Sequence, residues 1–200
     1  MTAAARSSAL AHQPIWVMHS HTIDTQREDD LWRAIGLARS LAAGPEPFVI
    51  AIDGRSGAGK SSLATRLLER ITSEEGNDAA ELFRLEDLYP GWEGLESGVD
   101  EYAAILGRVL RNEDATWHAW DWARNRREPR GRTLSAGANV IIAEGVGAIA
   151  PGHQEVRPHF GIWLHLESTI RRYRALTRDG DLYRPYWQVW AEQEERLFAR

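Results

Sequence analysis

Residues 48–61 read FVIAIDGRSGAGKS, and this stretch decides the fold. Its first five residues are all apolar, which is typical of a strand buried on both faces of a parallel sheet. A glycine-rich turn follows over 54–59, and residues 61–71 then place apolar side chains at helical spacing. The turn fits the pattern G-x-x-x-x-G-K-[ST], and a preceding strand and a following helix are the context that this pattern requires. The sequence therefore predicts a strand, a phosphate-binding loop (P-loop) and a helix.

Each residue type in the P-loop has a physical reason. Glycines let backbone N–H groups approach phosphate oxygens with no Cβ in the way, and the following helix adds the partial positive charge of its N-terminus. Lys60 is expected to bridge the β- and γ-phosphates of ATP, and the Ser61 hydroxyl is expected to bind Mg²⁺. Lys60 is also the only lysine among 24 Lys and Arg residues. The residues predicted to bind ATP are Gly54, Ser56, Gly57, Ala58, Gly59, Lys60, Ser61 and Ser62.

Short apolar runs alternate with helical patterns along the rest of the chain. This alternation predicts one α/β domain over residues 1–200, with a parallel sheet between two helical layers and a small Arg-rich lid. Further strands are expected at 82–85, 140–143 and 161–166, and helices at 24–43, 100–110, 168–180 (the lid, with Ser168 as N-cap) and 185–200. Residues 1–23 are expected to form a loose N-terminus, and the five arginines within 124–132 are expected to lie in a mobile loop.

Composition narrows the class of protein. The net charge of −5 argues against a general nucleic-acid binder, and no stretch approaches the ~18 apolar residues of a membrane-spanning helix. The absence of cysteine excludes disulfides and thiolate metal sites, which fits a cytoplasmic protein. The sequence leaves the oligomeric state open, and a homo-oligomer is one of the alternatives.

Three carboxylates follow apolar runs and are candidates for catalysis and metal binding. Glu86 and Asp87 come after the second run and Glu144 after the third, so all three are expected at the carboxyl edge of the sheet, where ligands bind. Either Glu86 or Asp87 could accept the proton of an attacking hydroxyl. The candidate Mg²⁺ ligands are Ser61, Asp87 and Glu144. Ordinary turn acids are the alternative interpretation.

Arginines supply the cations that phosphoryl transfer needs. Arg171, Arg174 and Arg178 recur at helical spacing and share one face, which could cover the phosphates and stabilise charge on their oxygens. A solvated surface helix is the alternative.

A GTPase would usually carry an N-K-x-D motif. The single lysine of the chain already lies in the P-loop, so this motif is absent.

Five segments in order resemble the uridine kinase family of P-loop kinases. They are residues 50–54 before the P-loop, 86–89 (similar to D-x-F-Y), 120–122 (similar to Y-D-F), 141–145 (a strand ending in E-G), and Arg171, Arg174, Arg178 and Asp179 of the lid. The resemblance runs from about Phe48 to Gly180. It implies a nucleoside-kinase-like P-loop fold, a catalytic base in 86–89, and acceptor contacts from Tyr89, Trp120, Asp121, Trp122 and Arg126.

Departures from the family pattern concern the acceptor. The position of the family's base, three residues before the tyrosine, is Glu86 here, and Asp87 competes for the role. The family's histidine near the base is replaced by the neighbourhood 123–127, whose arginines suit an anionic or differently shaped acceptor. No apolar strand is apparent between the lid and Arg200, where the family usually has one, and the sequence leaves open whether a final strand is missing.

These features predict an enzyme that transfers the γ-phosphoryl group of Mg-ATP to a hydroxyl of a small metabolite, with nucleosides among the candidates. Kinases for a nucleotide, a sugar or a vitamin are alternatives. An ATP-binding sensor with slow hydrolysis is the alternative from another class. The predicted catalytic residues are Lys60, Glu86, Asp87, Arg171, Arg174 and Arg178.

Overall fold

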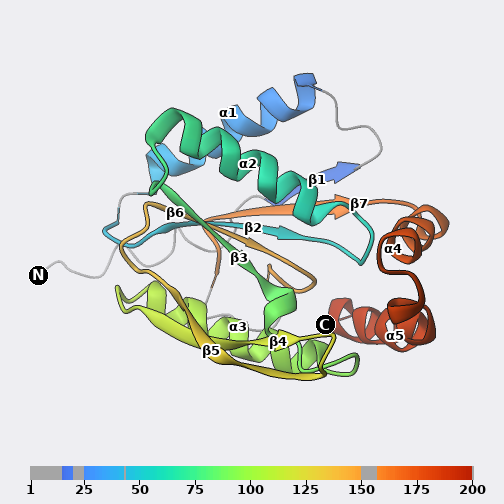
Figure 1. The fold of residues 1–200 in the computed structure, drawn as a ribbon. Coiled ribbons are helices and arrows are strands. Elements are labelled where there is room, and N and C mark those ends of the chain that lie inside the picture. Colours follow the sequence, from blue (N-terminus) through green and yellow to red (C-terminus); the bar gives the residue numbers. More distant parts are fainter. Residues whose placement is uncertain (1–14, 20–24, 43, 150–156, 200) are drawn as a thin grey trace, which may run out of the picture.

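A parallel sheet between layers of helices forms the body of the protein (Figure 1). The computed structural model describes residues 15–19, 25–42, 44–149 and 157–199. Its sheet has the order β1-β7-β2-β6-β3, and every neighbouring pair is parallel. The predicted α/β class with a parallel sheet is therefore confirmed. The strands are β1 (Ile15–His19), β2 (Phe48–Asp53), β3 (Ala80–Arg84), β6 (Val140–Glu144) and β7 (Phe160–His165).

Helices cover both faces of this sheet (Figure 1). Helices α1 (Thr25–Leu41) and α2 (Lys60–Glu75) lie on one face, and α3 (Leu95–Val109) lies on the other. Helices α4 (Ser168–Tyr183) and α5 (Trp187–Phe198) lie beyond the carboxyl end of β7, joined by a short 3₁₀ turn at Arg184–Tyr186. No helix among these described residues is both long enough and apolar enough to span a bilayer.

Strand β2 is buried on both faces, as its apolar run predicts. Phe48, Ile50 and Ile52 belong to the core beneath α1 and α2, whereas Val49 and Ala51 belong to the core beneath α3. This alternation follows the two-residue period of a strand. The sheet order places β2 between β6 and β7, so the P-loop that follows β2 lies in the middle of the carboxyl edge.

The predicted mobile loop at 124–132 is wrong, because most of it belongs to a β-hairpin. Strand β4 (Ala115–Asp121) pairs antiparallel with β5 (Arg126–Leu134), and Trp117 lies opposite Arg132. Along β4 the side chains alternate between buried and exposed, which anchors the hairpin on the core. Strand β5 exposes most of its side chains, so it has no apolar alternation of its own and depends on β4 for its position.

Residues 15–19 correct the prediction of a loose N-terminus over 1–23. They form β1, which pairs with β7 at the edge of the sheet, and the rest of that segment lies outside the described residues. The run Ile-Trp-Val-Met gives this segment the β-branched and aromatic character of a strand. Residues 187–198 form a helix, as predicted. The edge of the sheet beside β7 is formed by β1.

The start of α3 and the cap of α4 differ from the predicted ones. Helix α3 begins at Leu95 rather than Asp100, because residues 95–99 already bury apolar side chains. Helix α4 is capped by Glu167 rather than Ser168, since the Glu167 side chain accepts hydrogen bonds from the N–H groups of Thr169 and Ile170. Gly180 has a positive φ of 54°, and it kinks α4 three residues before the helix ends at Tyr183.

Phe83 tests how the hairpin docks on the sheet. Its ring is 1% exposed and lies 4.8 Å from the ring of Trp117 and 5.8 Å from that of Tyr102. Phe83→Ala is expected to lower the free energy of unfolding by about 3–5 kcal/mol, because it leaves a cavity where three elements meet. Leu37→Ala, at a side chain that is 64% exposed, is the control and should change stability by less than about 0.5 kcal/mol. Urea unfolding measures both, and a cost below about 1 kcal/mol for Phe83→Ala would contradict this packing.

Candidate active site

The P-loop connects β2 to α2 and depends on glycine for its path. Gly54 and Gly57 have φ values of 139° and 79°, which side chains of L-residues rarely adopt. A Cβ on Gly57 would lie 2.2 Å from the backbone oxygen of Arg171, so the loop packs directly against the start of α4. A side chain at this position would push the loop and the lid helix apart.

The N-terminus of α2 meets the requirements of an anion site. It has no side-chain cap, so its first N–H groups remain available to a phosphate. Lys60 opens this helix, and its ammonium donates hydrogen bonds to the carbonyl oxygens of Gly54 at 2.8 Å and Arg55 at 3.3 Å. Burial lowers the pKa of Lys60, and the carboxylates of Glu144 and Glu194 oppose this shift. The loop therefore holds a buried ammonium beside unsatisfied backbone donors.

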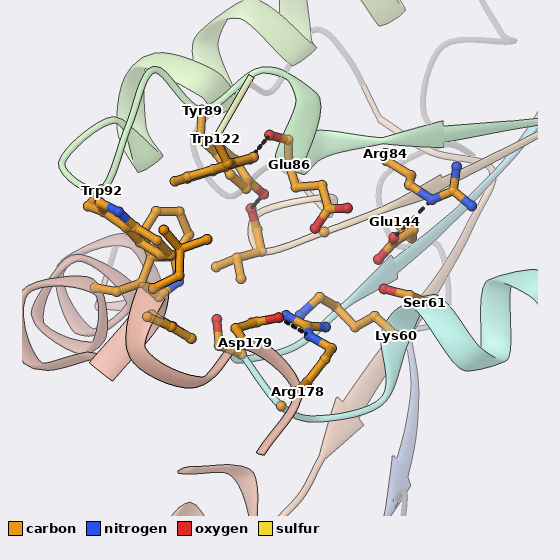
Figure 2. A pocket seen from close by; sticks show the side chains of 17 residues that line it. Lys60, Ser61, Arg84, Glu86, Tyr89, Trp92, Trp122, Glu144, Arg178 and Asp179 are labelled. Atoms are coloured by element: carbon orange, nitrogen blue, oxygen red, sulfur yellow. Dashed lines mark hydrogen bonds and ion pairs between the residues drawn. The ribbon is translucent and has the colours of Figure 1, made fainter. Parts of the chain in front are cut away.

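Glu144 lies next to the P-loop, as predicted from the strand that it ends. Its side chain is buried and lies beside the Ser61 side chain (Figure 2). Burial raises the pKa of Glu144, while Lys60 counteracts the shift. Arg84, opposite Glu144 on the neighbouring strand, brings its Nε to 4.0 Å from a Glu144 oxygen. A hydroxyl and a carboxylate side by side are oxygen donors of the kind that Mg²⁺ accepts.

Glu86 and Asp87 point to different places, although they are adjacent in the 3₁₀ turn Leu85–Asp87. Glu86 lines the cavity beside the P-loop (Figure 2). Asp87 is not among the residues that line it, and its carboxylate pairs with Arg132 of β5 at 2.6 Å. Burial raises the pKa of Asp87, and Arg132 works against this shift. The geometry thus separates two carboxylates that the sequence could not rank, and it leaves Asp87 outside the cavity that Ser61 and Glu144 line.

Two hollows meet at the P-loop. The larger, about 430 Å³, extends from the P-loop between the turn at Glu86 and the lid (Figure 2). The smaller, about 290 Å³, lies between the P-loop and α4. Gly57, Lys60, Ser61 and Arg178 line both. The other residues that line the larger cavity are Ser56, Arg84, Glu86, Tyr89, Trp92, Trp122, Glu144, Gly145, Val146, Asp179, Leu182, Tyr183 and Trp190.

The three lid arginines do not act as one face. Arg178 lines both hollows and forms an ion pair with Asp179 at 2.7 Å, and Arg174 lines the smaller hollow. Arg171 lines neither of them; its guanidinium donates to the carbonyl oxygens of Ser56 and Leu166, both at 3.1 Å. Arg171 therefore contacts the P-loop backbone from outside the cavity.

Aromatic rings form the wall of the larger cavity opposite the P-loop. Trp92 stacks on Tyr183 and Tyr186 with centroid distances of 4.9 and 5.0 Å, and Trp122 packs against it at 4.6 Å. Trp122 also donates from its indole N–H to the carbonyl oxygen of Glu86 at 3.2 Å. Tyr89 donates from its hydroxyl to the carbonyl oxygen of Val146. The predicted contacts Tyr89 and Trp122 are thus part of the wall.

The other predicted acceptor contacts lie elsewhere. Trp120, Asp121 and Arg126 are not among the residues that line either hollow, and Asp121 pairs with Arg124 at 2.7 Å. Arg127 pairs with Glu101 at 2.5 Å. The arginines of the hairpin do not form the anion site that the sequence suggested, because acids of β4 and α3 take up two of these charges. The wall of the larger cavity also includes Tyr183 and Trp190 from the C-terminal region, which the sequence analysis does not assign to the site. Only their aromatic character could have indicated this role.

Curated uridine kinases are similar in sequence to this chain. A uridine kinase of Deinococcus deserti is 26% identical over 147 residues, which is 66% of this chain and 69% of that protein. A uridine kinase of Leuconostoc citreum is 28% identical over 152 residues, 69% of this chain and 71% of that protein. The resemblance to the uridine kinase-like family is confirmed. No protein-family model matches the chain.

A solved structure of another protein has a similar fold. A protein from Silicibacter sp. TM1040, described as a fructose transport system kinase, superposes with a TM-score of 0.61 at 17% identity. The match covers 74% of this chain and 79% of that one. This likeness supports a P-loop kinase fold. The curated relatives support a P-loop kinase at 26–28% identity.

Asp53 belongs to the segment 50–54 that resembles the uridine kinase family, and its side chain links two loops of the site. Its fully buried carboxylate accepts from the backbone N–H groups of Gly54 at 2.6 Å, Gly147 at 2.9 Å and Ile149 at 3.0 Å. One oxygen serves Gly54 and Gly147, and the other serves Ile149. Asp53 thus ties the P-loop to the loop that follows Glu144.

Asp53→Asn is expected to lower the free energy of unfolding by about 1–3 kcal/mol, because the amide has a single oxygen and its NH₂ must face a buried N–H donor. Asp78→Asn, at an exposed acid, is the matched control and should have an effect below about 0.5 kcal/mol. Urea unfolding at neutral pH measures both variants. Equal stabilities for Asp53→Asn and Asp78→Asn would show that the three hydrogen bonds contribute nothing measurable.

Proposed function

We propose that the protein transfers the γ-phosphoryl group of Mg-ATP to a hydroxyl of a small acceptor with a flat ring. The observation that carries this proposal is the meeting of the two hollows at Lys60, Ser61 and Arg178. The smaller hollow has the cations and backbone donors that suit a triphosphate. The larger has a carboxylate beside an aromatic wall, which suits an acceptor.

The donor side is proposed to hold the triphosphate by backbone N–H groups and three cations. The uncapped N-terminus of α2 would receive the β-phosphate, and Lys60 would leave the loop carbonyls to contact the β- and γ-phosphates. Arg174 and Arg178, which line the smaller hollow, would stabilise charge on the phosphoryl oxygens.

The residues at the P-loop also fit Mg²⁺. Ser61 offers a hydroxyl, and Glu144 beside it offers a carboxylate that could hold a water of the ion. Among the described residues, no group of three or more His, Asp or Glu side chains could hold a metal ion on its own. This fits Mg²⁺, which usually takes one or two protein oxygens and completes its shell with phosphates and water. When bound, the ion would neutralise part of the phosphate charge.

Glu86 is proposed as the catalytic base. The acceptor oxygen would attack the γ-phosphorus, the bond from that phosphorus to the β,γ-bridging oxygen would break, and ADP would leave. The hydroxyl proton would pass to the Glu86 carboxylate, which lines the acceptor cavity and is exposed to it. Asp87 is held by Arg132 and would serve as a structural acid.

The aromatic wall supports an acceptor with a planar ring, because Trp92, Trp122 and Tyr183 line the cavity with large apolar rings. The similar uridine kinases make nucleosides the first class to test. An acceptor that already carries a phosphate is disfavoured, since its charge would compete with the triphosphate for Lys60 and Arg178.

Release of ADP from Mg-ATP, measured against nucleosides, nucleotides, sugars and vitamins with a no-acceptor control, tests this function. One nucleoside should raise the rate clearly above the control. Lys60→Ala should lower this acceptor-dependent rate by about 100-fold or more, because the cation that neutralises the phosphates is lost. Arg130→Ala, at an exposed cation of β5, is the matched control and should behave as wild type. ATP binding with no acceptor-dependent turnover would favour a nucleotide sensor.

A comparison of Glu86→Gln with Asp87→Asn tests the assignment of the base. Glu86→Gln should lower kcat by about 100- to 1,000-fold with little change in the KM for ATP, because only the proton acceptor is removed. Asp87→Asn keeps a polar group of the same size and should change kcat by less than about threefold. The assignment is wrong if Asp87→Asn has the larger effect on kcat.

A further inference from the structure

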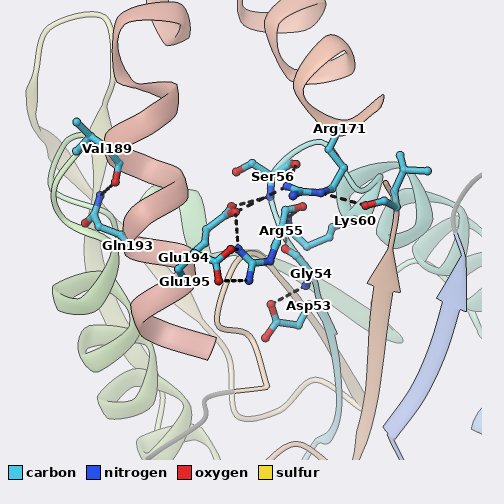
Figure 3. A network of polar contacts seen from close by, with 11 residues as sticks. Asp53, Gly54, Arg55, Ser56, Lys60, Arg171, Val189, Gln193, Glu194 and Glu195 are labelled. Carbon is cyan, nitrogen blue, oxygen red and sulfur yellow. Dashed lines mark hydrogen bonds and ion pairs between the residues drawn. The ribbon is translucent and has the colours of Figure 1, made fainter. Parts of the chain in front are cut away.

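Two adjacent polar residues of α5 are buried against opposite sides of the active site. Glu194 is 1% exposed and Gln193 is 8% exposed, and neither lines the two hollows. Figure 3 shows Glu194 directed toward the P-loop and Gln193 on the other side of the helix. Buried polar groups at the centre of a network are costly unless all their partners are present.

Glu194 fixes the P-loop from outside. One carboxylate oxygen accepts from the backbone N–H of Ser56 at 2.7 Å, and the guanidinium of Arg171 donates to the Ser56 carbonyl oxygen at 3.1 Å (Figure 3). Both backbone polar groups of Ser56 are therefore engaged by α4 and α5. Ser56 lies in the middle of the P-loop, so its position sets the path of the residues that follow it.

The charge of Glu194 is balanced within the same network. Its second oxygen lies 3.8 Å from Arg171 and 4.0 Å from Arg55. Arg55 also pairs with the neighbouring Glu195 at 2.7 Å, but the Glu195 side chain is 72% exposed and touches no P-loop backbone. Glu194 and Glu195 thus share Arg55 as a partner, but only Glu194 is buried and accepts a hydrogen bond from the Ser56 amide.

Gln193 fixes the acceptor side in the same manner. Its side-chain oxygen accepts from the backbone N–H of Leu95 at 3.3 Å, and its NH₂ donates to the carbonyl oxygen of Trp92 at 2.7 Å. Helix α3 has no side-chain cap of its own at Gly94, so Gln193 satisfies one of its first N–H groups from another helix. Trp92 belongs to the aromatic wall of the larger cavity.

We propose that Glu194 and Gln193 are positioning residues through which α5 holds the two halves of the active site in register. Glu194 sets the shape of the P-loop, and Gln193 sets the position of the segment 92–95 that carries the aromatic wall. This inference rests on the proposed function only in taking the P-loop as the nucleotide site.

Nucleotide affinity tests the role of Glu194 without any acceptor. Calorimetry with Mg-ATP and Mg-ADP on the full chain should give a Kd about 10- to 100-fold higher for Glu194→Ala, the usual effect of losing a charged hydrogen bond. Glu194→Gln should give a smaller increase, because its amide oxygen still accepts from Ser56. The control Glu195→Gln and the variant Gln193→Ala should both stay within about twofold of wild type.

Hydrogen–deuterium exchange separates positioning from general stability. Glu194→Ala should speed exchange in peptides that cover 54–58, and Gln193→Ala should speed it in peptides that cover 92–96, with no crossed effect. Should Glu194→Ala fail to fold, Glu194→Gln provides both readouts. Wild-type affinity and exchange in the Glu194 variants would overturn the proposal, as would faster exchange throughout the chain in either variant. Absence of Mg-ATP binding by the wild type would refute the proposed function and leave the exchange experiment to decide the inference.

Discussion

The buried ammonium of Lys60 is the constraint on which the site depends. Removing a cation from water is costly, and burial lowers its pKa, so its charge must be supported by its surroundings. Carbonyl oxygens of the P-loop accept its hydrogen bonds, and the carboxylates of Asp53, Glu144 and Glu194 surround it. Each carboxylate comes from a different element, which explains why β2, β6 and α5 must all converge on one loop.

The position of α4 and α5 follows from the same loop. The P-loop can pass close to the backbone of Arg171 only because Gly57 has no side chain, and this approach brings the lid helix to the phosphate side. Helix α5 then fills the space between the P-loop and α3 with Gln193 and Glu194. The Trp92 stack on Tyr183 and Tyr186 joins the lid end to the acceptor side. The same helices therefore shape both hollows.

The elements that could be predicted from the sequence are those whose signals are local. The P-loop, the buried strands and Glu144 at the end of one of them all come from runs of a few residues. Other features depend on partners far along the chain: Gln193 contacts Trp92, and Arg127 pairs with Glu101 across 26 positions. Glu86 and Asp87 differ only through the direction that a 3₁₀ turn gives them, and packing against the hairpin decides that direction. No periodicity in the sequence records such contacts.

The arginines of the hairpin show why local charge is a poor guide to the acceptor. A cluster within 124–132 suggests an anion site, yet Arg124, Arg127 and Arg132 pair with acids of β4, α3 and the turn after β3. The pairs with α3 and with the turn after β3 link the hairpin to the rest of the domain, and all three pairs neutralise arginine charge. The cations that line the cavities are Lys60, Arg84, Arg174 and Arg178. Lys60 and Arg178 line both hollows, Arg84 lines the larger and Arg174 lines the smaller. Under the proposed function, the phosphates would lie beside Lys60 and Arg178, and the acceptor would face aromatic rings and a carboxylate, which would select it by shape and hydrogen bonding rather than by charge.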